Sequence, residues 1–216
     1  MSTLIIDLLI GYSILIAAGI GIIRFNSIAH EFYPFLFMTW LGTLNETLSL
    51  LFIFTTGNNT VNSNIFVLPE YLLIVYQFYR WSNGAIKKYA VLALLGVALW
   101  ITDNLVLNTV NDNNSLFRAF LAFVAVFLSM DQVNKLLIYE REPLYKNSAF
   151  IICVGFLLYF GFKAFIESYN MFHPRLSPGL LRHLWIILYI VNGIANLLYA
   201  LAVLWMPSKI KFTLPY

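Results

Sequence analysis

Charged residues are scarce in this sequence. Asp, Glu, Lys and Arg together make up 11% of its 216 residues, and hydrophobic residues make up 61%. A soluble domain carries about 25% charged residues, since its surface faces water. A chain with so few charges cannot cover a water-exposed surface of this size. The composition therefore predicts a membrane protein.

Cysteine and histidine are also rare, which argues against several kinds of site. The single cysteine, Cys153, cannot form an intramolecular disulfide and is predicted to be a buried, inert thiol within a helix. The three histidines are too few to supply the converging ligands of an intramembrane zinc hydrolase. The sequence also has no H-E-x-x-H, G-x-S-x-G or glycine-rich phosphate-binding motif. We therefore expect no metal, no cofactor and no catalytic residues.

Long apolar stretches, in contrast, fill most of the chain. A helix needs about 20 mostly apolar residues to cross a hydrocarbon core of roughly 30 Å. Lipid-embedded backbone must satisfy its own hydrogen bonds, and these stretches lack the strict alternation of barrel strands, so we expect helices. They predict an all-α polytopic transmembrane bundle of seven helices in one domain, residues 1–216. The predicted spans are 4–23, 34–55, 66–81, 89–110, 116–138, 149–168 and 183–206.

The first and third spans have particular features at their starts. The first could be a secretory signal, but its first charged residue is Asp7. A signal peptide opens with positive charge, so we expect a retained helix. The third is the shortest, and Leu68-Pro69-Glu70 suits a helix start, where proline needs no N–H and a carboxylate favours the helix dipole.

The distribution of the thirteen Lys and Arg residues predicts the orientation. Short loops rich in basic residues stay in the cytoplasm. With the N-terminus outside, nine basic residues fall on the inner side and four lie outside or in the outer halves of spans. We therefore expect the N-terminus outside and the C-terminus in the cytoplasm. This bias accounts for the net charge of +3, and no basic cluster is long enough to indicate nucleic-acid binding.

Polar and charged residues lie at similar predicted depth on several spans. Such groups cost at least about 2.5 kcal/mol each in a hydrocarbon core and usually face the bundle interior or a water-filled cavity. We therefore predict a polar pocket that opens to the outside. Its predicted ligand-binding residues are Glu46, Glu70, Asp103, Lys163, Tyr189, Asn192 and Asn196. A second group nearer the cytoplasm is predicted to form an inner polar network: Gln77, Asp131, Gln132 and Asn134.

Each of these residues also has a purely structural interpretation. Asn192 and Asn196 share one helix face, and such amides often serve as packing contacts worth about 0.6 kcal/mol per hydrogen bond. Lys163 could pair with Glu167 one turn later, or extend to the interface. Glu46 has no long stem to reach water, so it should be protonated, paired or in contact with a wet cavity. The sequence leaves these alternatives open.

Other seven-helix classes fit the sequence less well. A retinal pigment attaches its chromophore to a lysine in the last helix, and residues 183–206 contain none. A transporter built from two three-helix repeats around a linker helix would have the predicted topology, but the two halves show only weak similarity. An intramembrane lipid enzyme would require an acid beside a nucleophile or metal in one pocket. The transporter is the main alternative.

Three segments resemble a known family. They are residues 143–160 (PLYKNSAFIICVGFLLYF), 69–81, and 184–206 (LWIILYIVNGIANLLYALAVLWM). They are similar to uncharacterised small bacterial seven-helix integral membrane proteins, whose layout resembles the seven-helix sensor modules of histidine kinases. The resemblance implies a sensor-like role and supplies no catalytic residue.

These observations together predict a receptor or sensor-like protein, integral to the cell membrane and expected in the bacterial inner membrane. It would bind an unknown small or amphipathic ligand in the outward-facing pocket. Basic inner loops at 82–88 and 139–147 would pass the signal to a cytoplasmic or membrane partner. The expected partners are the lipid bilayer, the ligand and this signalling partner, and nucleic acid is not expected to be one.

Overall fold

The structure is a computed structural model that describes residues 10–82, 84–140, 143–172 and 178–209. Within these residues the chain is helical, with seven α-helices and no β-strand. The prediction of an all-α fold is therefore confirmed. The α-helices are α2 (Ile14–Arg24), α3 (Tyr33–Thr56), α4 (Thr60–Arg80), α5 (Ile86–Ile101), α6 (Ser115–Tyr139), α7 (Ser148–Phe172) and α8 (Pro178–Trp205). Shorter helical segments are the 3-10 turns η1 (His30–Phe32) and η3 (Leu144–Lys146) and the π-helical η2 (Thr102–Leu107).

Five of the described helices are long and apolar enough to cross a bilayer. Each coincides with a predicted span, because the apolar runs that defined the spans also form the helices. The five are His30–Thr56, Ile86–Leu107, Ser115–Tyr139, Ser148–Met171 and Arg182–Trp205. The chain is therefore a membrane protein with several transmembrane helices.

The first predicted span, 4–23, differs from the described structure. Residues 4–9 lie outside the described part of the chain. The backbone turns at Tyr12 and Ser13, and α2 contains only 11 residues. At 1.5 Å per residue α2 is about 16 Å long, roughly half of a hydrocarbon core. The described residues therefore do not form one continuous spanning helix here.

The third predicted span, 66–81, is also corrected. Helix α4 begins at Thr60, and Pro69 lies inside it instead of at its start. The segment 60–64 lies between the predicted spans 34–55 and 66–81 and was therefore expected to belong to their connection. Its Asn62 and Asn64 are instead buried and hydrogen-bonded within the bundle. With these polar groups and Glu70, α4 is not among the helices apolar enough to span a membrane alone.

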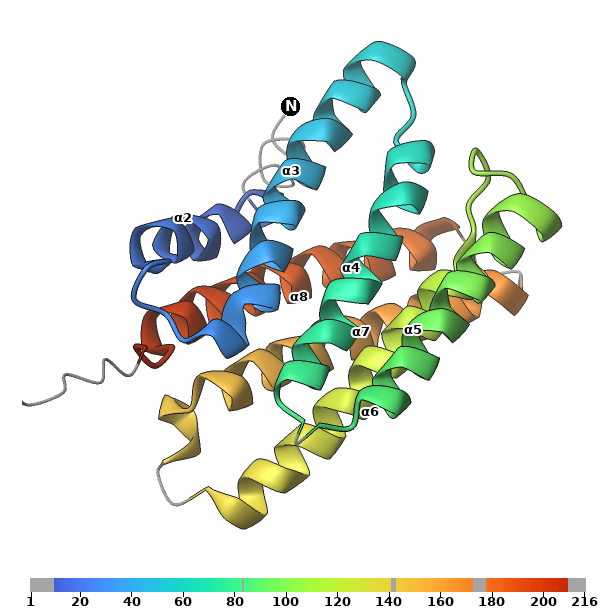
Figure 1. Ribbon diagram of the computed structural model, residues 1–216. Coiled ribbons are helices and arrows are strands. Elements are labelled where there is room, and N and C mark those ends of the chain that lie inside the picture. The colour runs from blue at the N-terminus through green and yellow to red at the C-terminus, as the bar shows by residue number, and fades with distance from the viewer. Residues whose placement is uncertain (1–9, 83, 141–142, 173–177, 210–216) are drawn as a thin grey trace, which may run out of the picture.

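The helices form a ring. In chain order α2 packs on α3 and α3 on α4, and the ring then continues through α6, α7 and α8 back to α2. Helix α5 lies outside the ring against α4 and α6. Figure 1 shows α3 and α4 side by side, with α7 and α8 crossing behind them. The ring brings residues from the two ends of the sequence around a common interior.

Close backbone approaches join neighbouring helices in the ring. A Cβ built on Gly155 of α7 would lie 2.4 Å from the Tyr199 ring of α8, and one on Gly96 of α5 would lie 2.0 Å from the Tyr71 ring of α4. The Tyr71 hydroxyl donates a hydrogen bond of 2.6 Å to the carbonyl of Leu92. Small residues allow helices to approach closely where lipid supplies no hydrophobic driving force.

Aromatic side chains fill part of the interior. Ring centroids of Phe35 and Tyr199 lie 5.3 Å apart, those of Phe156 and Tyr199 5.7 Å, and those of Phe78 and Phe156 6.1 Å. These rings come from α3, α4, α7 and α8, and each is at most 5% exposed. We call Phe35, Phe78, Phe156, Phe160 and Tyr199 the aromatic layer. These edge-to-face and tilted ring contacts pack α3, α4, α7 and α8 against one another on one side of the ring interior.

The two ends of the bundle differ in chemistry. One end, which we call the amide-rich end, contains the α3–α4 connection, the α5–α6 connection and the start of α6. There Asn64 accepts a hydrogen bond of 2.7 Å from Arg118 Nη2 and donates to the carbonyls of Val110 and Asp112 at 2.8 Å. The opposite end, which we call the basic end, carries Arg24, Arg80, Lys87, Lys88, Lys135, Lys146 and Lys209. There Arg24 donates to the carbonyls of Val203, Leu204 and Met206 and so caps α8. The predicted charge asymmetry is thus present along the bundle axis.

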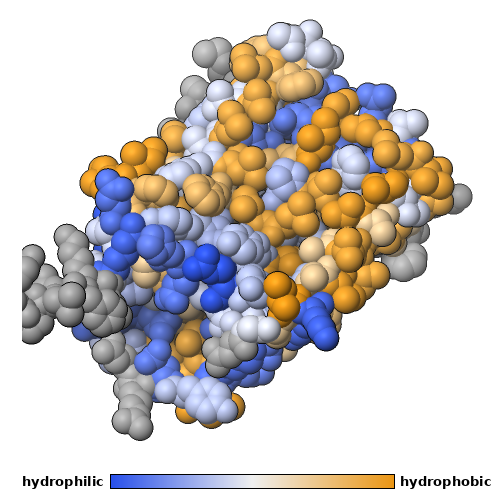
Figure 2. Space-filling view, viewed as in Figure 1, coloured by the Kyte–Doolittle hydropathy of each residue, from blue (hydrophilic) through white to orange (hydrophobic). Residues whose placement is uncertain are grey.

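The outer surface is strongly apolar. Ile23, Phe54, Leu94, Val106 and Ile138 each expose 70% or more of their surface. Figure 2 shows hydrophobic side chains over much of the face turned toward the viewer, with hydrophilic ones mainly at the lower left and a smaller group at the upper right. An exposed apolar surface this extensive is typical of a protein whose exterior contacts lipid.

Candidate functional site

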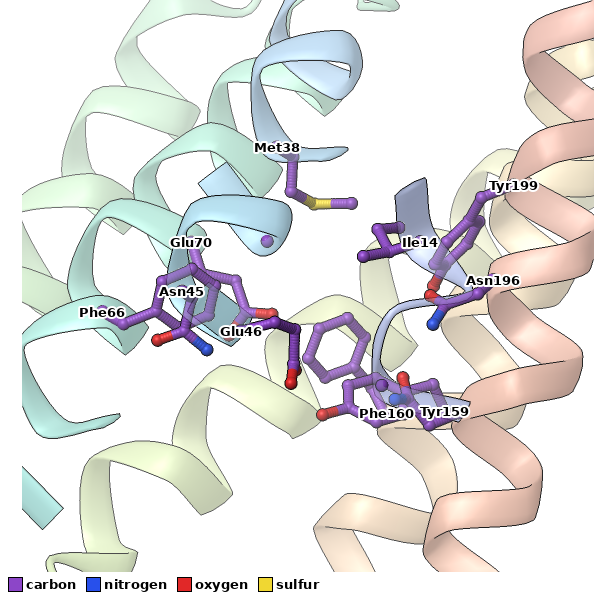
Figure 3. Close-up of a pocket in the computed structure, with 13 residues that line it drawn as sticks. Ile14, Met38, Asn45, Glu46, Phe66, Glu70, Tyr159, Phe160, Asn196 and Tyr199 are labelled. Carbon is purple, nitrogen blue, oxygen red and sulfur yellow. The ribbon is translucent and has the colours of Figure 1, made fainter. Parts of the chain in front are cut away.

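A polar cavity of about 110 Å³ lies inside the ring. Its walls come from α2, α3, α4, α7 and α8, near the middle of each long helix. Figure 3 shows Glu46 directed into the space between α3 and α4 on one side and α7 and α8 on the other. We call this the central cavity. It is lined by Gly11, Ile14, Met38, Gly42, Asn45, Glu46, Phe66, Glu70, Tyr159, Phe160, Asn192, Asn196 and Tyr199.

Glu46 is the most unusual group in the central cavity. Its side chain is partly buried, and within the described residues it makes no hydrogen bond or ion pair. Gly11 lies against it, since a Cβ there would be 2.8 Å from Glu46 Oε2. The missing side chain at Gly11 therefore leaves room for the carboxylate. An acid that is partly removed from water and lacks a partner is costly unless something else supplies a positive charge or hydrogen bonds.

Glu70 faces the same cavity and has the Lys163 ammonium beside it. Its Oε2 atom is buried without a hydrogen-bond partner in the described structure, and Lys163 Nζ lies 4.0 Å away. At this separation the two charges attract each other without a direct hydrogen bond. The Lys163 ammonium also lies over the rings of Tyr159 at 5.3 Å and Phe160 at 5.7 Å. Lys163 is thus held beside the cavity by an acid and two aromatic faces.

Amide groups supply most of the remaining polar wall. Asn45 accepts a hydrogen bond of 2.9 Å from Asn62, and Asn196 donates one of 2.9 Å to Ser13 Oγ. These bonds leave the Asn45 amide nitrogen and the Asn196 amide oxygen for the cavity. Asn192 is half-buried and makes no hydrogen bond within the described residues. The wall therefore offers carboxylate and amide oxygens next to aromatic rings.

Four of the predicted ligand-binding residues line the central cavity: Glu46, Glu70, Asn192 and Asn196. Lys163 is not among the lining residues, but its Nζ atom lies 4.0 Å from Oε2 of the lining residue Glu70. The sequence favoured Glu167 as the partner of Lys163, but the structure pairs Lys163 with Glu70 of another helix, and Glu167 accepts instead from Asn170 at 3.5 Å. Spacing along one helix could not reveal this, because it carries no information about the residues that α4 presents.

Asp103 and Tyr189 lie elsewhere. Asp103 accepts a hydrogen bond of 2.8 Å from the backbone N–H of Phe117 and one of 3.0 Å from Asn108. Asp103 lies in the π-helical segment η2 and thus accepts from a backbone N–H in the first turn of α6 that has no partner within the helix. The N-cap residue of α6, Asn114, makes no side-chain cap hydrogen bond. Tyr189 is 42% exposed and is not among the cavity-lining residues.

The four residues of the predicted inner network have separate partners. Gln77 accepts from the N–H of Phe35 at 2.9 Å and donates to the carbonyl of Glu31 at 2.8 Å, which fixes the start of α3 to the end of α4. Asp131 pairs with Lys135 on its own helix at 2.7 Å. Gln132 lines a different cavity, and Asn134 is exposed. In the described structure no hydrogen bond connects these four side chains.

Sequence reasoning missed much of the cavity wall. Asn45 carried a signal, because it is adjacent to Glu46 within an apolar span. Tyr199 carried one as well, because its spacing places it on the same helix face as Asn192 and Asn196. Phe66 and Phe160 carried none, since aromatic residues in a transmembrane helix usually pack against other helices. Gly11 could not be identified because its role depends on which residue packs against it.

Other features of the described residues narrow the chemistry. They contain no group of three or more His, Cys, Asp or Glu side chains placed to hold a metal ion. In the α5–α6 connection, hydrogen bonds from the Thr109 hydroxyl and backbone N–H hold the pKa of Asp112 below its usual value. Asp112 is therefore an ionised turn residue at the amide-rich end, and the central cavity is the place where acidic groups converge.

Comparisons with protein-family models, curated proteins and solved structures find no match to this chain. The resemblance to small bacterial seven-helix proteins stays a prediction.

Proposed function

We propose that this protein is an integral membrane receptor that binds a small organic cation in the central cavity. The observation that carries the proposal is the Glu46 carboxylate, which faces the cavity without a hydrogen bond or ion pair in the described structure. A cationic ligand would supply the missing partner.

The charges around the cavity favour a cation. Glu46 and Glu70 are both in its wall, whereas Lys163 is the cation beside it and is associated with Glu70. If all three groups are ionised, one negative charge is left over, and it lies at Glu46. The rings of Phe66 and Tyr159 add electron-rich faces, which attract organic ammonium groups.

The size of the cavity favours a small ligand over a lipid-like one. Sites for drug-sized ligands occupy about 300–1,000 Å³, whereas the central cavity measures about 110 Å³. A primary amine or a compact quaternary ammonium ion suits this volume. Of the small and amphipathic ligands that the sequence predicts, the small class fits better.

The aromatic layer favours a receptor that holds its ligand over a transporter that moves it across the membrane. Phe156 and Tyr199 of this layer are in contact with each other and lie at most 5% exposed between the central cavity and the basic end. A ligand in the cavity would press on these two rings, which belong to α7 and α8, two of the helices that line the cavity. By binding one helix arrangement more tightly, the ligand would shift the equilibrium between arrangements.

We further propose that the amide-rich end faces outside and the basic end faces the cytoplasm of a bacterial cell, so that the N-terminus is outside and the C-terminus inside. Basic loops favour the cytoplasmic side. The loops at 82–88 and 139–147 would then present the ligand-dependent change to a cytoplasmic or membrane partner.

A thermal-stability screen tests the receptor proposal. Purified protein is heated with a series of amines from methylamine to choline, each compared with its neutral isostere at the same concentration. An amine that binds should stabilise the wild type by about 2.7 kcal/mol at one hundred times its Kd, and the neutral isostere should not. Glu46→Gln should abolish this stabilisation, while Asp131→Asn, which removes a half-buried acid at the basic end, should retain it.

Two results would refute the receptor proposal. One is that neutral isosteres stabilise the protein as well as the amines do. The other is that Glu46→Gln and Asp131→Asn respond alike.

Transport is the second candidate, and one observation favours it. A second cavity lies at the basic end, with Phe32 and Trp81 of its wall in contact with each other and Trp81 in contact with Phe78 of the aromatic layer. Transporters place their sites near the bilayer midplane and open them to each side in turn. Uptake of a radiolabelled amine into proteoliposomes would support transport, whereas saturable binding without uptake supports the receptor.

A further inference from the structure

A cavity of about 430 Å³ lies at the basic end of the bundle, and we call it the vestibule. It is formed where α4, α6 and α8 end and where α3 and α7 begin. Its walls are mainly polar. It is lined by Glu31, Phe32, Arg80, Trp81, Gln132, Leu136, Lys146, Asn147, Ser148, Ala149, Trp205 and Pro207.

Two buried donors in the vestibule wall have no acceptor in the described structure. They are the indole nitrogen of Trp81 and the hydroxyl of Ser148. Ser148 is 3% exposed, so its hydroxyl is removed from bulk water. Buried donors are almost always hydrogen-bonded in native proteins, and an unpaired one costs about 1–3 kcal/mol. Two such donors at one cavity indicate a missing acceptor.

The surrounding charges indicate that this acceptor is an anion. Arg80 and Lys146 line the vestibule, and both side chains are otherwise exposed. Glu31 is the one carboxylate among the described lining residues, and it is exposed as well. The lining residues therefore carry one net positive charge, and the Glu140 carboxylate, outside the lining, accepts a hydrogen bond of 2.7 Å from Asn147.

The start of helix α7 adds to this field. Helix α7 begins at Ser148 and contains 25 residues. The aligned peptide dipoles of such a helix place about half of a positive charge at its N-terminus. Asn147 caps the helix by accepting from the N–H of Phe150 at 3.1 Å. The preceding N–H groups of the first turn have no acceptor within the helix itself, and helix N-termini of this kind bind phosphate and carboxylate groups.

We propose that the vestibule binds a phosphate group, supplied by an anionic lipid headgroup or by free phosphate. Trp81 and Ser148 would donate hydrogen bonds to its oxygens, and Arg80 and Lys146 would balance its charge. The site is at the end of the membrane-crossing helices, where lipid phosphates lie. It is separate from the central cavity and does not depend on the function proposed for that cavity.

Two binding measurements test the proposal and distinguish the sources. In the first, delipidated protein in a neutral detergent is titrated with inorganic phosphate, with chloride at equal ionic strength as the reference. In the second, protein in nanodiscs of phosphatidylcholine with a small fraction of phosphatidylglycerol is analysed by native mass spectrometry for retained lipid. Saturable phosphate binding in detergent indicates a free-anion site, and selective retention of phosphatidylglycerol indicates a headgroup site.

Matched variants connect the binding to the vestibule. Ser148→Ala removes one donor with little change in the shape of the wall, and Trp81→Phe removes the other while keeping an aromatic ring. Each should weaken binding about tenfold or more, as expected for a hydrogen bond to a charged group. Lys88→Gln removes an exposed charge at the same end without touching the vestibule and should change binding less than twofold. The proposal is overturned if neither probe binds, if both donor variants bind like the wild type, or if Lys88→Gln weakens binding as much as they do.

Discussion

The acidic residues within the membrane-crossing part differ in what their neighbours offer them. Asp103 receives a backbone N–H and an amide, and Glu70 has the Lys163 ammonium nearby. Glu46 has neither within the described residues. Three acids that look alike in the sequence thus have different environments, and only Glu46 is left available for a ligand.

The role of Asp103 leads to a prediction that separates folding from binding. Asp103→Ala leaves the N–H of Phe117 and the amide of Asn108 without their acceptor, so the free energy of unfolding should fall by about 1–3 kcal/mol. Amine binding to the folded protein should not change, because Asp103 does not line the central cavity. Thermal unfolding and amine titration of the same sample check both statements. Thr102→Ala is the control, since the Thr102 hydroxyl donates to the carbonyl of Ala98 one turn earlier and its loss should change stability by less than about 0.5 kcal/mol.

Sequence reasoning placed four residues of the cavity wall but could not separate them from Asp103. Depth along a span can be estimated from the sequence, whereas the rotation of each helix about its axis cannot. Glu46, Glu70, Asn192 and Asn196 face the ring interior, while Asp103 faces the start of α6. That difference arises from helix packing and from the π-helical turn, and neither has a clear signature in one sequence.

At the scale of whole elements, α4 shows why polar sequence is a poor guide to loops in this chain. Asn62 and Asn64 look like loop residues, yet both lie in the first turns of α4 because α3 and α6 offer partners for them. Pro69 interrupts the hydrogen-bond ladder of α4 without ending the helix, which packing against neighbouring helices makes tolerable. The five apolar helices, in contrast, were predicted within a few residues, since hydrophobic length alone defines them.

The contact between α4 and α5 predicts that a Gly→Ala substitution lowers the stability of the protein, which is the opposite of its usual effect in a helix. Gly→Ala inside a helix normally stabilises it by about 1 kcal/mol. Gly96→Ala should instead destabilise the protein, because the new Cβ would lie 2.0 Å from the buried Tyr71 ring. We expect a loss of about 1–3 kcal/mol, as for other overpacked cores. Gly161→Ala is the matched control: nothing lies within 4 Å of its Cβ, and it should be neutral or stabilising. Equal melting temperatures for the two variants would show that α4 and α5 do not pack as described.

At the scale of the molecule, the apolar exterior and the contrasting ends define how the bundle would sit in a bilayer. Hydrophobic length predicted five of the seven proposed spans, and counting basic residues predicted the asymmetry of the ends. The ring itself could not be predicted, because it depends on which helices meet, and in particular on the contact of α2 with α8.

Cysteine labelling tests the proposed orientation. Asn113→Cys places a thiol at the amide-rich end and Lys87→Cys places one at the basic end, and both positions are exposed. A membrane-impermeant maleimide should label Asn113→Cys in intact cells and Lys87→Cys only after lysis. The native thiol, Cys153, is fully buried and should stay unlabelled in the wild type. The reverse pattern would place the N-terminus inside.

The most direct test of the central claim is the dissociation constant of the best-stabilising amine, measured by isothermal titration calorimetry for wild type, Glu46→Gln and Lys163→Met. Our account predicts one saturable site, binding at least about tenfold weaker in Glu46→Gln, and binding no weaker in Lys163→Met, because that change removes the positive charge beside the cavity. Equal affinity of Glu46→Gln and wild type, or a loss of binding in Lys163→Met alone, would contradict it.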